Sequence, residues 1–278
     1  MSDPFLKWAG GKRWLVAQHP EWLRIGTSRY LEPFLGSGAV FFRVQPEKAI
    51  LSDLNAELIE TYLALRDCPV AVWNTLRKHQ RSHGTQYYYR IRATVCRTSA
   101  TRAARFLYLN RTCFNGLYRV NLRGEFNVPK GTKSAVLLPT DDFCSVSKLL
   151  RQARLCACDF SNTISMAEEG DFLYVDPPYT VQHNTNNFLK YNEQIFSWYD
   201  QQRLARDLAL AAKRGVYILM SNADHPCIHG LYEGSVWQQI PVRRFSKLAS
   251  SAQHRRATTE LVVANYLTAE GKQENPRY

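Results

Sequence analysis

The sequence predicts an α/β nucleotide-binding fold that is interrupted by an inserted, mainly helical domain. Three observations support this fold class. Strand-like and helix-like segments alternate near the N-terminus, helical periodicity replaces them from residue 56, and strand signals return after residue 149. We therefore expect one discontinuous domain made of residues 1–55 and 150–278, and a second domain at 56–149.

The N-terminal α/β segment is predicted from a glycine turn between two strands. Gly36 and Gly38 allow main-chain N–H groups to approach a ligand closely, and Asp53 is placed to accept hydrogen bonds from ribose hydroxyls. The absence of a third glycine at the pyrophosphate position disfavours a dinucleotide. The expected elements, in order, are a strand at 29–32, the turn Phe34-Leu35-Gly36-Ser37-Gly38, a helix starting at 39–42, and a strand at 48–51 that ends at Ser52-Asp53.

The middle of the chain predicts helices followed by a β-hairpin. Apolar residues recur at three- and four-residue steps between 56 and 147, as at Leu58, Tyr62 and Leu65. Alternation over 117–128, around Arg123-Gly124, indicates the hairpin. Beyond it we expect strands at 155–158, 172–175, 216–220 and 261–266, a helix at 199–214, and a frayed polar tail at 270–278.

The charge distribution indicates a polyanionic partner. The chain has 278 residues, 45% hydrophobic and 22% charged, as in folded proteins, and a net charge of +12. Residues 56–149 contain 15 Lys and Arg against 6 Asp and Glu, which is +9 of that charge. Most of these residues are arginines interleaved with aromatic residues, and arginine binds both phosphates and base edges. This predicts a nucleic-acid-binding surface, with a solvated helix face as the alternative.

Membrane, disulfide and metal-binding classes are disfavoured. The longest apolar stretches are far shorter than a membrane span, and the first residues lack the pattern of a signal peptide, so we expect a cytoplasmic protein. Seven cysteines form no Cys-x-x-Cys pair, which favours reduced thiols. His225, Cys227 and His229 lie close in sequence, but no second cluster accompanies them, so we predict no metal site.

A carboxylate, a rigid bend and an aromatic ring meet where the apolar run 172–175 ends in Asp176-Pro177-Pro178-Tyr179. Such a set suits a planar amino group. Hydrogen bonds from that group to Asp176 and to the Pro177 carbonyl favour the pyramidal nitrogen, whose lone pair can attack. Tyr179 offers a face on which a base can stack. The alternative is an ordinary turn after a strand, so other motifs must decide.

Five motifs occur in one order along most of the chain: Phe5-Leu6-Lys7-Trp8-Ala9-Gly10-Gly11-Lys12, Glu32-Pro33-Phe34-Leu35-Gly36-Ser37-Gly38, Ser52-Asp53-Leu54-Asn55, Leu109-Asn110-Arg111 through Val128-Pro129, and Asp176-Pro177-Pro178-Tyr179. Together they resemble the Dam-type, D12 class DNA adenine-N6 methyltransferases. The resemblance implies a Rossmann-like methyltransferase sheet with an inserted DNA-recognition domain. It also implies S-adenosylmethionine as cofactor and methylation of adenine in double-stranded DNA, most often within GATC, by a monomer without a metal.

The resemblance assigns cofactor contacts by matching position. Asp53 would bind the ribose, and Asp176 would lie where cofactor and base meet. The full set is Trp8, Ala9, Gly10, Lys12, Glu32, Phe34, Gly36, Gly38, Asp53, Asp159, Phe160 and Asp176.

The resemblance likewise assigns DNA contacts, with Phe114 inserted into the duplex. This phenylalanine stands where a tyrosine is expected, which keeps stacking but removes a hydroxyl. After Pro129-Lys130-Gly131, this chain has Thr132-Lys133 where the family usually has an arginine that reads a flanking base, so the recognition sequence stays open. The expected DNA-binding residues are Lys7, Arg111, Phe114, Asn115, Leu117, Arg119, Asn121, Arg123 and Lys133.

Other functions compete with direct transfer to a flipped adenine. Cytosine-C5 methylation needs a nucleophilic cysteine, and we expect nothing near the single Pro-Cys pair, Pro226-Cys227, to act as an activating partner. Related enzymes with the Asp-Pro-Pro-Tyr motif modify RNA purines. A DNA-binding regulator could also retain a nucleotide pocket without turnover, although Trp8, Lys12, Asp53 and Asp176 together argue against loss of the catalytic site.

Overall fold

The computed structural model describes residues 4–8, 10–121, 124–181, 196–245, 257–267 and 272. It has a mixed α/β fold with a seven-stranded sheet, which confirms the predicted fold class. The chain divides into two compact units: unit 1 comprises Met1–Gln18 and Leu35–Cys158, and unit 2 comprises His19–Phe34 and Asp159–Tyr278. The domain boundaries expected at residues 56 and 149 stay a prediction.

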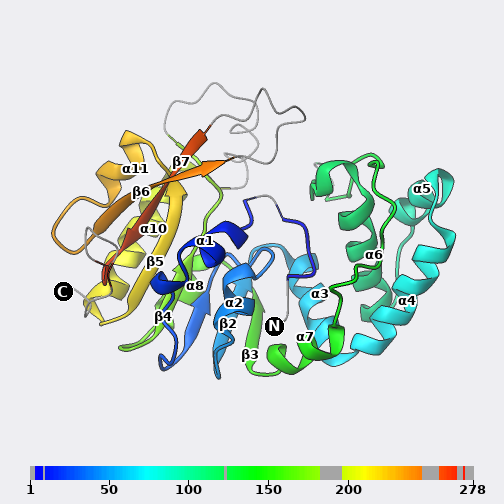
Figure 1. Cartoon of the computed structure of the whole chain (residues 1–278), viewed down its shortest axis with the longest axis horizontal. Helices are drawn as coiled ribbons and strands as arrows, with labels where there is room; N and C mark the ends of the chain where they lie inside the picture. Colours follow the sequence, from blue (N-terminus) through cyan, green and yellow to red (C-terminus); the bar gives the residue numbers. More distant parts are fainter. Residues whose placement is uncertain are drawn as a thin grey trace. The chain divides into compact units, whose positions relative to one another are not determined.

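Unit 1 combines two parallel strands with a set of helices (Figure 1). Strands β2 and β3 pair in parallel from Ala49 opposite Ala153 to Asp53 opposite Ala157. Helix α6 contacts both α3 and α4 and buries most of its length, which explains the helical periodicity of the sequence. The elements are α1 (Arg13–Gln18), α2 (Ala39–Val44), β2 (Ala49–Asp53), α3 (Ala56–Asp67), α4 (Pro69–Ser82), α5 (Thr85–Ala93), α6 (Ser99–Thr112), the 3-10 helix η2 (Phe114–Gly116), α7 (Phe143–Leu150) and β3 (Ala153–Ala157).

The predicted hairpin at 117–128 is only partly right. Within the described residues this region holds two isolated antiparallel bridges, Cys113 with Lys130 and Val120 with Phe126, and no extended ladder. The Asn121 side chain accepts the N–H of Glu125 and donates to the carboxylate of Glu125. The strand pairing is short: the main-chain N–H groups of Asn121 and Asn127 bond to the carbonyls of Glu125 and Arg119, on either side of the bridge between Val120 and Phe126.

Unit 2 contains the strand that leads into the Asp-Pro-Pro-Tyr motif. Strands β1, β4 and β5 pair in parallel, and β5, β7 and β6 pair antiparallel. All four residues of β4 are buried, as expected for a parallel strand covered on both faces. The elements are η1 (Pro20–Trp22), β1 (Tyr30–Glu32), α8 (Phe160–Ser165), β4 (Phe172–Val175), α10 (Trp198–Lys213), β5 (Tyr217–Ala223), α11 (Pro226–Leu231), β6 (Gln238–Phe245) and β7 (Ala257–Ala264).

Strand β6 was not predicted from the sequence. It mixes polar and apolar residues and contains Pro241, which removes one ladder donor. The strand lies at the end of the sheet order beyond β7, where a proline is tolerated because one edge needs no partner. Figure 1 shows β6 and β7 running side by side.

Two further features concern the described residues alone. None of their helices has both the length and the apolar character needed to cross a bilayer. The structure corrects the expectation that Cys227 has no activating partner nearby, because His225 Nδ1 lies 2.9 Å from its sulfur. His229 instead lies between Asp224 and Gln239. No group of three metal-ligating side chains is found in this part of the chain.

Candidate active site and nucleic-acid interface

The Asp-Pro-Pro-Tyr motif leaves the carboxyl end of β4, and residues of two other strands hold its polar side chains. Ser221 on β5 donates a hydrogen bond of 2.9 Å to Asp176 Oδ1. The Tyr179 hydroxyl donates to Glu260 Oε2 on β7, also at 2.9 Å. Glu260 is only 4% exposed. Both the carboxylate and the ring of the motif are therefore oriented by partners distant in sequence.

The electrostatics keep Tyr179 protonated. Burial raises the pKa of its phenol well above the usual value, and the negative charges of Asp176 and Glu260 raise the pKa further. A phenol in this environment stays neutral and acts as a donor, so it holds the ring against Glu260 across the physiological pH range. A phenol whose hydroxyl is bound to Glu260 suits a role in stacking rather than in proton transfer.

The sequence interpretation missed Ser221 and Glu260. Each carried a signal that could have been used. Ser221 follows the apolar run of β5, and Glu260 is a lone acid inside the apolar strand β7. A charged residue in a buried strand is rare without a partner, so its position alone pointed to a specific contact.

In unit 1 the structure brings together Trp8, Gly36 and Asp53 from the predicted cofactor set. Asp53 Oδ2 accepts the N–H of Gly36 at 3.0 Å, and its Oδ1 accepts the N–H of Asn55 at 3.0 Å. Burial raises the pKa of Asp53, while these main-chain N–H groups lower it. Gly36 has a φ of +47°, and a Cβ there would lie 2.7 Å from Trp8 Cδ1. The turn therefore requires glycine, and it fits a ligand that offers hydroxyl groups to a fixed carboxylate and a flat surface to an indole.

Other predicted cofactor residues of unit 1 have local structural roles. Gly38 has a φ of +64° and precedes α2, where a side chain would meet Tyr62 and Phe42. Lys12 is buried, and its amine donates to the Gly10 carbonyl at 2.8 Å. Ala9 lies outside the described residues.

In unit 2 the predicted cofactor residues are held by neighbouring side chains. Buried Glu32 accepts the hydroxyl of Tyr30 at 2.7 Å. Asp159 caps α8 and forms a two-bond ion pair with Arg203, both bonds at 2.8 Å. These contacts leave Asp159 as an anchored acidic group at a helix start.

Two predicted aromatic residues of unit 2 form a cluster. The rings of Phe34 and Phe160 stack with centroids 5.4 Å apart. Both rings also contact Phe196, and the guanidinium of Arg203 lies 4.2 Å from the Phe160 centroid. Phe160 is buried in this cluster, so it acts as a hydrophobic wall.

Five of the predicted DNA-binding residues lie in or beside the loop after α6 in unit 1. Phe114 is 52% exposed, so its ring is accessible to a partner molecule. Asn115 follows it with a φ of +54°, a left-handed conformation that asparagine tolerates better than most residues. Arg119 is exposed and donates to Asn127, while Leu117 is half-buried and Asn121 bonds to Glu125. Arg123 lies outside the described residues.

Lys7 and Lys133 place positive charge beside this loop. The N–H of Phe114 bonds to Pro129, and the N–H of Gly131 bonds to Thr112, so the segment leading to Lys133 is tied to the loop. The Lys7 amine donates to the Arg111 carbonyl at 3.1 Å. Partial burial lowers the pKa of Lys7, and the positive charge of Lys133 lowers it further. The positive charges of Lys7 and Lys133 repel each other, so an anion bound between them would be stabilising.

The expectation that Arg111 contacts DNA is corrected by the structure. Its side chain is 0% exposed. The guanidinium makes two bonds to Asp141, at 2.6 and 2.7 Å, and donates to the carbonyls of Val136 and Phe5. Four contacts inside unit 1 leave the guanidinium no route to a phosphate. Arg111 therefore links α6 to the N-terminal segment and to the segment before α7.

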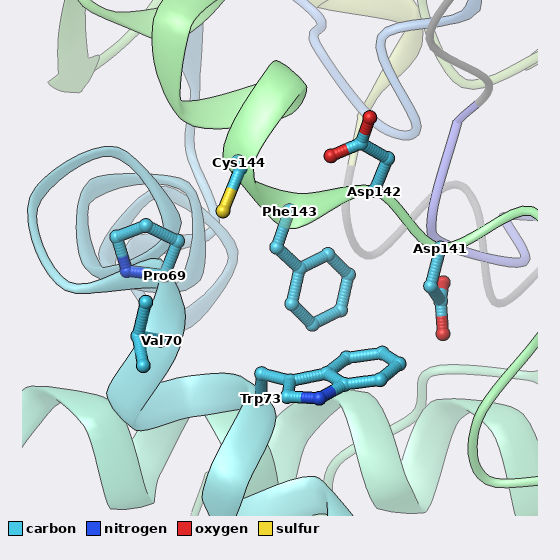
Figure 2. Close-up of a pocket in the computed structure, with 7 residues that line it drawn as sticks. All are labelled: Pro69, Val70, Trp73, Asp141, Asp142, Phe143 and Cys144. Carbon is cyan, nitrogen blue, oxygen red and sulfur yellow. The ribbon is translucent and has the colours of Figure 1, made fainter.

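A pocket in unit 1 borders this ion pair through Asp141 and is lined by none of the predicted site residues. Figure 2 shows Phe143 and Trp73 facing one another, and their ring centroids are 5.7 Å apart with planes at 89°. Asp141 reaches the edge of the pocket, but its carboxylate is bound to Arg111. The lining residues are Pro69, Val70, Trp73, Asp141, Asp142, Phe143 and Cys144.

The structure defines an α/β protein in which a carboxylate and an aromatic ring are anchored after a buried parallel strand, and comparison with known proteins identifies the family. Residues 8–245 match the family model of D12 class N6 adenine-specific DNA methyltransferases. The chain belongs to this family and is an adenine-specific DNA methyltransferase.

Three relatives illustrate the similarity. The type II methyltransferase M1.LlaDCHI of Lactococcus lactis subsp. cremoris is 35% identical over 272 residues, which cover 95% of each chain. The type II methyltransferase M.MjaIII of Methanocaldococcus jannaschii is 33% identical, over 95% of this chain and 99% of its own. A DNA adenine methylase of Serratia marcescens is 36% identical, over 86% of this chain and 90% of its own.

Proposed function

We propose that this enzyme transfers a methyl group from S-adenosylmethionine to N6 of an adenine flipped out of double-stranded DNA, with GATC as its target. The observation that carries the proposal is the pair of anchored groups at the end of β4: Asp176 bound to Ser221, and Tyr179 bound to Glu260. Their chemistry suits an exocyclic amine. The proposed form is a cytoplasmic monomer.

Asp176 acts by orientation. Its carboxylate and the Pro177 carbonyl accept the two N–H bonds of the adenine amino group, which localises the lone pair on nitrogen. The cofactor supplies a methyl group on a positively charged sulfur that also serves as the leaving group. Since the amine becomes more acidic as its bond to carbon forms, Asp176 need only accept a proton late in the reaction.

Tyr179 and Phe114 reduce the cost of base flipping. Extrusion of a base costs a few kcal/mol. Stacking on an aromatic ring contributes about 1–3 kcal/mol per base, and the Tyr179 ring is held for that purpose by Glu260. Exposed Phe114 suits insertion into the duplex.

Cofactor contacts come from the glycine turn and its neighbours. Asp53 is fixed by the N–H groups of Gly36 and Asn55, which orients its oxygens for ribose hydroxyls. Trp8 supplies an apolar surface beside Gly36. We assign Gly10, Lys12, Gly38, Glu32, Phe34, Asp159 and Phe160 to the surroundings of the cofactor.

Methylation mapping tests this proposal. Purified protein is incubated with S-adenosylmethionine and a duplex library containing every short sequence, and modified adenines are located by sequencing. We expect methylated adenine at a defined site, with Asp176→Ala losing at least about 100-fold in turnover while duplex affinity changes little. An unmodified library, or full turnover by Asp176→Ala, would contradict the proposal. Preference for RNA in a competition assay would favour the alternative substrate.

A further inference from the structure

Asn110 fixes the main chain of Lys7 from both sides. Its side chain is 1% exposed on α6. Its Oδ1 accepts the Lys7 N–H at 2.9 Å, and its Nδ2 donates to the Lys7 carbonyl at 2.7 Å. The same Nδ2 lies 3.4 Å from the Gly116 carbonyl. One buried amide thus holds an N-terminal residue and the loop after α6 in a single arrangement.

The side chain of Lys7, whose main chain Asn110 holds, contacts the loop that carries Phe114. A Cβ built on Gly116 would lie 3.0 Å from both Cβ and Cδ of Lys7, so lysine and loop are in close contact. The lysine amine donates to the Arg111 carbonyl, and the positive charge of Lys133 lowers its pKa. A displacement of Lys7 must therefore disturb the proposed DNA-binding loop.

The next residue, Trp8, contacts the glycine turn. The indole lies against Gly36 and stacks on Tyr118 with ring centroids 5.8 Å apart and planes at 24°. Tyr118 belongs to the same loop and bonds to Glu57 at 2.6 Å. A ligand at the glycine turn that displaces the indole would disturb its stacking on Tyr118, and Trp8 directly follows Lys7 in the chain.

We propose that Asn110 is a positioning residue that couples cofactor binding to DNA binding through Lys7 and Trp8. This inference rests on the proposed function, since it takes Lys7 as a DNA contact and Trp8 as a cofactor contact. Coupling of this kind is reciprocal: a ligand at one site changes affinity at the other by the same factor in both directions. Such factors are roughly 5- to 150-fold in proteins.

The test compares duplex affinity with and without S-adenosylhomocysteine, the reaction product, which cannot support turnover. In the wild-type enzyme we expect this compound to tighten DNA binding at least about 5-fold. In Asn110→Ala the ratio of duplex affinities with and without S-adenosylhomocysteine, the coupling factor, should fall toward 1. Thr112→Val is the matched control, because Thr112 is equally buried on α6 but its hydroxyl donates only within the helix, to Tyr108 at 2.6 Å. It should retain the wild-type factor.

Asn110→Asp provides a second variant if removal of the side chain unfolds the protein. Aspartate keeps the acceptor for the Lys7 N–H but replaces the donor that faces the Lys7 carbonyl, so the factor should again fall. Circular dichroism verifies that each variant is folded. The proposal is overturned if the wild-type enzyme shows no coupling, or if both Asn110 variants keep the factor of Thr112→Val. Absence of any methylation by the wild-type enzyme would instead reject the proposed function.

Discussion

Arg111→Met is expected to lower the free energy of unfolding by about 3–5 kcal/mol, because it leaves a buried carboxylate without its cation. The magnitude follows from the contacts. The Arg111 guanidinium is fully buried, makes two bonds to Asp141, and donates to the carbonyls of Val136 and Phe5. The Asp141 side chain is itself 1% exposed, so the carboxylate left behind is poorly solvated.

A double-mutant cycle isolates the pair. Asp141→Leu alone should also cost several kcal/mol, whereas Arg111→Met with Asp141→Leu should cost much less than the sum of the two single changes. The reason is that the double variant removes both charges of this pair and leaves neither partner alone. Urea denaturation of the three variants measures the coupling directly.

The salt dependence of DNA binding separates this structural role from a phosphate contact. Each lost phosphate contact reduces the slope of log affinity against log salt by about 0.9. We expect Arg111→Met to leave that slope unchanged. Lys133→Met is the control, because Lys133 is exposed beside the proposed DNA-binding loop: it should lower the slope and change stability by less than about 0.5 kcal/mol. A reduced slope with unchanged stability in Arg111→Met would refute the reasoning.

Three further predictions concern the glycine turn, the motif tyrosine and a buried histidine. Gly36→Ala should weaken cofactor binding at least about 10-fold, because the left-handed conformation costs alanine about 1–2 kcal/mol and the new Cβ would lie 2.7 Å from Trp8. Calorimetry measures the affinity, and an unchanged value would contradict this prediction. Tyr179→Phe should slow methylation and lower the free energy of unfolding by about 1.5–3 kcal/mol, since Glu260 loses a hydrogen bond. Glu260→Gln keeps an acceptor for the Tyr179 hydroxyl, so its methylation rate and its free energy of unfolding should stay closer to the wild-type values. Burial lowers the pKa of His79 from 6.5 to about 4, so the unfolded chain binds the proton more readily between these values. The free energy of unfolding should therefore fall by up to about 3 kcal/mol as pH drops from about 6.5 to about 4, and urea denaturation of His79→Gln should show a smaller fall.

Periodic patterns predicted the elements well because they depend on neighbours in sequence. The run Phe172–Val175 reads as a strand because a parallel strand covered on both faces needs apolar residues throughout. The glycine turn before Ala39 was predictable for a similar reason, since left-handed conformations favour glycine over all other residues. Strand β6 was missed because its polar residues and Pro241 match no buried pattern.

By itself, the sequence determined the α/β class, the order of the motifs, the positive middle segment and the family to which the chain is similar. Tertiary structure alone decided which groups meet. Tyr179 and Glu260 are 81 residues apart, and Lys7 and Asn110 are 103 apart, so no local spacing relates them. The same holds for Arg111, whose charge predicts an exposed contact until Asp141 is placed beside it. Burial of a polar group depends on partners that only chain folding brings within hydrogen-bonding distance.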